Sequence, residues 1–215
     1  MFKEIFTKVK KTMKVVDWQE DIGSDSFLDI LKGRQNISKW DVKVCGYYGY
    51  LDCLKYLHKQ GYTFNPDRDQ VQEYMLKGDQ VNCLRYYTEH QLPETDVIMK
   101  KAILEGAYEC VMYLSTIKKV TVEEFALACD WFFRKLNTPI SSKLDKIIKY
   151  FYSLNSQIFK THPEILDTAI VNSGFYSSPF AELFEDEFWR DVFLLSDVRK
   201  YPSIQEEMTI KYRKE

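Results

Sequence analysis

The sequence of 215 residues predicts an all-α fold, and three observations lead to this prediction. Gly and Pro are sparse, with 8 and 6 residues, which argues against the many tight turns of an all-β fold. Apolar residues recur at helical spacing, as in 121–136. A segment built around Cys, Leu and Tyr also recurs about every 30 residues, which indicates a stacked array of helix pairs.

Composition narrows the class of protein further. The length suits one domain, or one domain plus an accessory segment, and such a chain can bury its core without metals or disulfides. Because the formal net charge is −2, no general attraction to nucleic acid is expected. Five cysteines without a CxxC pair predict free, buried thiols in a reducing compartment. No apolar run is long enough to cross a bilayer, and lysines interrupt the N-terminal segment, so we expect an intracellular protein.

Residues 1–39 are expected to form an N-terminal helical cap. Apolar residues in 1–16 lie at helical spacing, with five lysines on the opposite face. Such a helix could contact an anionic membrane surface or an acidic partner, but we favour a cap over the exposed end of the array. A second, short helix follows in "SFLDILKG" and ends at Gly33.

The repeated segments lie in residues 40–151. Three of them share an acidic or amide residue, Cys, an aliphatic residue and Tyr in the same order, and they occupy 49–57, 79–87 and 106–114. A weaker echo follows at 144–151. Each unit is expected to contain a first helix, a tight turn with Gly, a second helix and a longer loop.

The first helices are predicted from start and stop signals. Pro66 and its polar neighbours predict a helix from about Asp67 to Lys77, ended by Gly78. Further helices are expected over 95–105, 121–136 and 163–172. Residues 152–215 leave the period and are expected to form a C-terminal helical cap, in which apolar residues recur at helical spacing between Phe180 and Leu195.

The best-preserved segment, "GYLDCLKYLHKQGY" at 49–62, resembles the second helix of an ankyrin repeat. The matching positions are Gly49, Leu51, Asp52, Leu54, Lys55, Leu57 and Gly61. The segment "LDCLKYL" is similar to the divergent ankyrin repeats that are abundant in giant DNA viruses of amoebae and in some protists. The resemblance covers roughly 40–136 and implies a short, degenerate ankyrin-like helical solenoid between non-repeat capping helices. The family's Thr-Pro-Leu-His motif is absent, and the units are shorter than usual.

The resemblance implies a non-enzymatic module that binds a protein partner through the solenoid surface. Candidate partner-binding residues are those expected to be exposed on first helices and loops: Phe64, Arg68, Gln72, Lys100 and Lys101. The alternative is a structural component of a virion or other large assembly, in which the aromatic excess of 15% would form interfaces. An intracellular location, in the cell or host cell or in the virion, fits both.

No catalytic residue, cofactor or metal site is expected. The chain contains no Gly-rich phosphate loop, Walker motif or G-x-S-x-G motif. Its three histidines lie outside metal-binding motifs, and the consecutive acidic residues 185–187 would point in different directions on a helix. Cysteines one repeat apart would lie about 10 Å from each other, too far to share an ion.

Overall fold

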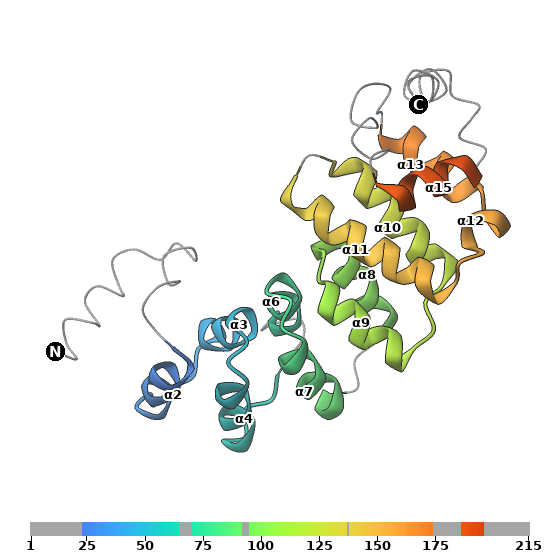
Figure 1. The fold of residues 1–215 in the computed structure, drawn as a ribbon. Helices are drawn as coiled ribbons and strands as arrows, with labels where there is room; N and C mark the ends of the chain where they lie inside the picture. Colours follow the sequence, from blue (N-terminus) through green and yellow to red (C-terminus); the bar gives the residue numbers. More distant parts are fainter. Residues whose placement is uncertain (1–22, 65–69, 92–94, 137, 174–185, 196–215) are drawn as a thin grey trace.

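The computed structural model describes residues 23–64, 70–91, 95–136, 138–173 and 186–195, and no β-strand occurs in these ranges. The all-α prediction is therefore confirmed for this part of the chain (Figure 1). The helices are α2 (Ser24–Lys32), α3 (Lys39–Tyr48), α4 (Leu51–Lys59), α6 (Val71–Lys77), α7 (Val81–Gln91), α8 (Thr95–Glu105), α9 (Tyr108–Ile117), α10 (Val122–Arg134), α11 (Pro139–Leu154), α12 (Ile158–Thr161), α13 (Glu164–Ser173) and α15 (Glu187–Leu195).

The helices from α3 to α11 pack as four pairs in two rows. In the first row, α3 packs against α6, α6 against α8, and α8 against α10. In the second row, α4 packs against α7, α7 against α9, and α9 against α11. The two members of each pair also contact each other. α2 packs against α4 at the beginning of the second row, and α13 packs against α10.

The same backbone turn joins the first and second helices of three pairs. Gly49, Asp79 and Gly106 each adopt the left-handed conformation, with φ of 74°, 51° and 64°. The next residue in each turn donates its amide to a carbonyl five residues earlier, which is the bond that closes a Schellman motif. The donor–acceptor pairs are Tyr50–Cys45 (2.9 Å), Gln80–Met75 (2.8 Å) and Ala107–Ala102 (2.9 Å).

Repeat-equivalent tyrosines link successive helices of the second row, and we call these contacts the tyrosine ladder. Each hydroxyl meets a polar side chain of the preceding second-row helix. The pairs are Tyr86 with Nδ1 of His58 (2.7 Å), Tyr113 with Oγ1 of Thr88 (2.7 Å) and Tyr150 with Oγ of Ser115 (2.5 Å). The ladder reaches α11, so the weak echo at 144–151 occupies an equivalent place in the array.

The direction of two ladder bonds follows from the other bonds that the acceptors make. Thr88 donates its hydroxyl proton to the carbonyl of Arg85 at 2.9 Å, and Ser115 donates to Met112 at 2.6 Å. A hydroxyl has one proton to donate, so both side chains must accept from the tyrosine. Each tyrosine therefore donates to the preceding helix and satisfies an oxygen that is partly shielded from water.

We expect Tyr113→Phe to lower the free energy of unfolding by about 1 kcal/mol, because it removes a hydrogen bond to the buried Thr88. Tyr56→Phe is the matched control: Tyr56 occupies the equivalent place in α4, but its hydroxyl has no hydrogen bond within the described residues. Urea unfolding followed by circular dichroism would measure both. Equal losses in the two variants would contradict a stabilising ladder.

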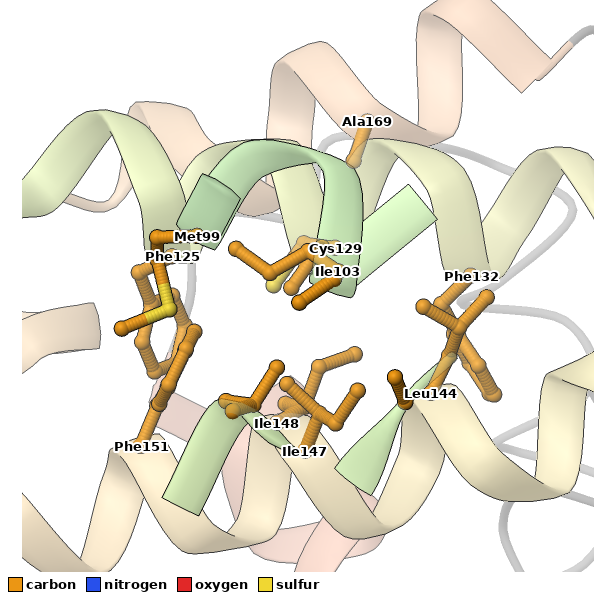
Figure 2. Close-up of a cluster of buried hydrophobic side chains, with 14 of the residues drawn as sticks. Met99, Ile103, Phe125, Cys129, Phe132, Leu144, Ile147, Ile148, Phe151 and Ala169 are labelled. Carbon is orange, nitrogen blue, oxygen red and sulfur yellow. The ribbon is translucent and has the colours of Figure 1, made fainter. Parts of the chain in front are cut away.

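The buried side chains of the described residues form two clusters, one drawn from α2 to α7 and a larger one drawn from α6 to α15. Figure 2 shows side chains of α8, α10, α11 and α13 converging, among them Met99, Phe125, Phe151 and Ala169. Nearer the C-terminus, the ring of Trp189 stacks on that of Phe132 with centroids 4.8 Å apart. The five largest fully buried side chains, Trp189, Tyr87, Phe133, Phe151 and Phe159, are all aromatic, so part of the aromatic excess forms the core.

Most predicted helices form close to the expected boundaries. α8 matches 95–105, and α10 begins after Thr121, which caps it through a capping box with Glu124. α6 begins at Val71, whereas the predicted start near Asp67 lies outside the described residues. Residues 1–22, 174–185 and 196–215 also lie outside, so the N-terminal basic helix and most of the C-terminal cap stay predictions.

All five cysteines are free and buried, as the sequence predicted. Burial raises the pKa of the Cys83 thiol to about 12 and that of Cys129 still further. Thiolate is the reactive form, so at these two cysteines both access and ionisation oppose alkylation. A hydrogen bond with Cys45 lowers the pKa of the Cys53 thiol, so at Cys53 burial alone opposes alkylation. We expect no cysteine to react with iodoacetamide at pH 7.5 within an hour and all five to react in 6 M guanidinium, measured by mass spectrometry. Rapid native labelling of any of the five would contradict this packing.

Candidate functional site

An exposed stripe runs along α8. Val97, Lys100, Lys101 and Leu104 lie at positions i, i+3, i+4 and i+7, which places them on one face of the helix. All four are exposed, with 44% of Val97 and 36% of Leu104 accessible to water. The opposite face packs into the core through Ile98, Met99, Ala102 and Ile103.

The two lysines of the α8 stripe form no ion pair within the described residues. Asp96, one turn earlier, is instead held by Lys118 at 2.5 Å. The hydrogen bond and charge of Lys118 lower the pKa of the Asp96 carboxyl below its usual value. The positive charges of Lys100 and Lys101 therefore face water between two exposed apolar side chains.

Aromatic rings and lysines alternate on the adjoining helices of the first row. The Nζ of Lys43 lies 5.5 Å from the ring of Trp40 on α3 and 4.9 Å from that of Tyr74 on α6. The Nζ of Lys77 lies 5.3 Å from the centroid of the same Tyr74 ring, and Lys77 also pairs with Glu73. These distances are those of cation–π contacts, which hold the side chains in place.

α10 borders the other side of the α8 stripe. The indole of Trp131 donates to the carbonyl of Leu104 at 2.9 Å, which satisfies a backbone oxygen at the end of α8. Lys135 lies 4.6 Å from the Trp131 ring. We use the term first-row face for the surface that runs from Trp40 through Tyr74 and the α8 stripe to Trp131.

Two of the predicted partner-binding residues are not exposed, which corrects the sequence prediction. Phe64 is only 3% exposed, because its ring packs against those of Tyr62 and Tyr87. Gln72 is 9% exposed and lies on α6, which packs against α3, α7 and α8. A phenylalanine in a polar loop and a glutamine on a short helix carried no sequence signal of this burial.

The other predicted partner-binding residues have different outcomes. Lys100 and Lys101 are exposed, as predicted, and they lie together on the α8 stripe. Arg68 lies outside the described residues. Val97 and Leu104 were missed, although their spacing relative to the two lysines could have placed them on the same face.

A groove of about 540 Å³ lies between the ends of α9 and α11 and the loop that leads into α10. The buried side chains of Phe125, Phe151 and Ile158 contribute to its lining. Ile117 and Leu154, which also line it, are among the few large apolar side chains exposed in the described part of the chain, at 48% and 54%. The groove is therefore a second, separate apolar surface.

One wall of the groove is held by an ionic network. Lys118 bridges Asp96 to the buried Glu124, with an Nζ–Oε1 distance of 2.6 Å to the latter. Burial alone would lower the pKa of Lys118, but its hydrogen bonds and ion pairs with the two carboxylates outweigh this and raise it. Glu124 also accepts the amide of Thr121 at 2.9 Å. These bonds fix the loop between α9 and α10.

The described residues hold no group of three or more His, Cys, Asp or Glu side chains arranged to bind a metal ion. Among the helices that the structure describes, none has the length and apolar character needed to cross a membrane. In comparisons with known proteins, no family model, no curated protein and no solved structure matches the chain.

Proposed function

We propose that the protein is a non-enzymatic recognition module that binds a protein partner through the first-row face. The observation that carries this proposal is the α8 stripe, where exposed Val97 and Leu104 flank Lys100 and Lys101, neither of which has an ion-pair partner in the described residues. In a protein interface, exposed apolar side chains of this kind supply the buried centre, and charged groups beside them supply the polar rim and the specificity.

We also propose that residues 40–151 form a degenerate ankyrin-like solenoid. Three features support this part of the proposal: the two rows of helices, the left-handed residues at three equivalent turns and the tyrosine ladder. In such an array each unit contacts only its neighbours, so the surface residues of successive first helices are held at fixed spacing. A partner then meets a preorganised surface and little ordering is needed on binding.

The alternative, a structural component of a virion or other assembly, has less support. That role would use the aromatic excess as interface, yet Phe132, Phe133, Phe151 and Trp189 are all buried inside this chain. The proposed setting is the interior of a cell or host cell, which agrees with five free thiols.

The test is affinity capture from the native cell with matched surface variants. Val97→Ser combined with Leu104→Ser should remove the captured partner, because both substitutions lie on the α8 stripe. Ile117→Ser combined with Leu154→Ser is the control, since it removes the same kind of exposed apolar surface at the groove. Quantitative mass spectrometry would compare the captured proteins.

Retention of every captured protein by the α8 variant would contradict the first-row face as the binding surface. Loss with the groove variant alone would assign binding to the groove between α9 and α11 instead. Both variants change exposed positions, so their stability should stay within about 0.5 kcal/mol of the parent protein.

A further inference from the structure

The first-row face has an excess of positive charge in a protein whose overall charge is negative. The helices α3, α6 and α8 carry five lysines (Lys39, Lys43, Lys77, Lys100 and Lys101) and four acidic residues (Asp41, Glu73, Asp96 and Glu105), which leaves one net positive charge. The whole chain carries −2. Asp41 and Asp96 each pair with a cation outside these helices, Arg34 and Lys118, so they do not neutralise the lysines of this face.

The charged groups of this face are continuous from one helix to the next. Lys43 and Lys77 both lie over the ring of Tyr74. The hydrogen bond with Glu73 raises the pKa of Lys77 on α6, and the charge of Glu105 on α8 adds to this effect. Glu105 in turn follows Lys101 by one helical turn. Lys100 and Lys101 are exposed and have no ion-pair partner in the described residues, and the same holds for Lys39 at the start of α3. Lys43 also has no ion pair there, but it is buried and donates to Gln70 at 2.7 Å.

We propose that the first-row face binds an acidic segment of a partner protein that also carries apolar side chains. Carboxylates of the segment would pair with Lys100 and Lys101, and its apolar side chains would pack on Val97, Leu104 and Trp40, each of which is at least 36% exposed. Such a segment would neutralise the two lysines of the α8 stripe and cover its two apolar side chains in the same complex. This inference rests on the proposed function and specifies the chemistry of the partner.

The same face suits a single-stranded nucleic acid less well. Base stacking needs an open ring face. Lys43 and Lys77 both lie over the ring of Tyr74, and Lys135 lies over that of Trp131. Glu73 and Glu105 would also repel phosphates. An acidic peptide can instead place its few carboxylates at the two lysines and avoid the glutamates.

The experiment selects peptides from a displayed random library on the full chain. The inference expects enriched sequences to combine Asp or Glu with large apolar residues. A synthetic peptide of the enriched sequence would then be titrated by fluorescence anisotropy at 50 and 300 mM NaCl, and its affinity should fall with salt because exposed charges are screened.

Paired charge reversals locate the site. Lys100→Glu with Lys101→Glu should weaken peptide binding at least about tenfold. Lys143→Glu with Lys146→Glu on α11 makes the same change in net charge at two exposed lysines of the second row, and it should weaken binding less than about twofold. If the α8 reversal impairs folding, Lys100→Gln with Lys101→Gln replaces it with the same expected direction.

The acidic-segment inference would be overturned by enriched peptides without an excess of Asp and Glu, or by equal effects of the α8 and α11 reversals. The capture experiment would then decide separately whether the face binds a protein. Failure to enrich any peptide would also overturn it. Oligothymidylate that binds more tightly than the peptide and depends on Lys100 and Lys101 would assign the face to nucleic acid. If the peptide tests fail but the Val97→Ser, Leu104→Ser variant still loses its captured partner, only the acidic-segment inference is wrong and the proposed function stands. If the variant keeps its partner, the proposed function itself is wrong.

Discussion

Gly78→Ala should lower the free energy of unfolding by about 3 kcal/mol, the upper part of the usual range for overpacking a core. A Cβ atom at Gly78 would lie 2.1 Å from the carbonyl oxygen of Tyr47, which no side-chain rotation can relieve because the oxygen belongs to the backbone. The clash lies between α6 and α3, so these two first-row helices would have to move apart. Chemical denaturation in urea would measure the change.

Gly33→Ala is the matched control for this prediction. Gly33 and Gly78 both follow the last residue of a helix, with φ of −82° and −86°, a conformation that alanine adopts without strain. A Cβ at Gly33 would meet only backbone oxygens 3.7 Å away, which is ordinary contact. We expect Gly33→Ala to be neutral or to stabilise the protein by about 0.5 kcal/mol through the unfolded state. Equal effects of the two substitutions would contradict the close approach of α3 and α6.

The role of Gly78 could be predicted only in part from the sequence. The sequence correctly predicted that a helix ends there, because glycine commonly follows the last helical residue. The structure gives a different physical reason: the left-handed residue is Asp79, and Gly78 is needed because the backbone of α3 comes close. Tyr47 and Gly78 are 31 positions apart in the sequence, so their close approach leaves no local signal. The sequence therefore predicted where the helix ends but not why glycine is needed there.

The array itself was more predictable than its surface. Repeated Cys and Tyr residues in 49–57, 79–87 and 106–114 identified the second-row helices, because a repeated packing environment selects similar residues. Exposure depended on details that the repeat does not contain. Phe64 and Gln72 are buried by contacts specific to their own units, whereas Lys100 and Lys101 are exposed because α8 directs its other face into the core.

Asp79 holds a position where two other turns of the array have glycine, and its side chain explains why. The carboxylate accepts the amides of Glu109 at 3.2 Å and of Cys110 at 3.0 Å, which lie in the first turn of α9. Those amides have no partner within their own helix, and a negative charge at a helix N-terminus is favourable. Asp79 therefore turns the chain in its own unit and caps the second helix of the next one.

Asp79→Ala should lower the free energy of unfolding by about 2 kcal/mol: about 1 kcal/mol from the lost cap and about 1 kcal/mol from placing alanine at a φ of 51°. Asp79→Gly removes the cap but relieves the backbone, so it should cost about 1 kcal/mol or less. Asp79→Asn keeps a capping oxygen and tolerates the left-handed conformation, so it should be the mildest change. Urea unfolding of the three variants would give this order.

Amide hydrogen exchange separates the two causes. In the Ala and Gly variants, the amides of Glu109 and Cys110 should lose protection, since their acceptor at Asp79 is gone. In the Asn variant they should keep most of it. If the Asn variant is as unstable as the Ala variant, the cap depends on charge rather than on the hydrogen bonds. If the Gly variant is as unstable as the Ala variant, backbone strain at this turn contributes nothing, and the cap alone joins one helix pair to the next.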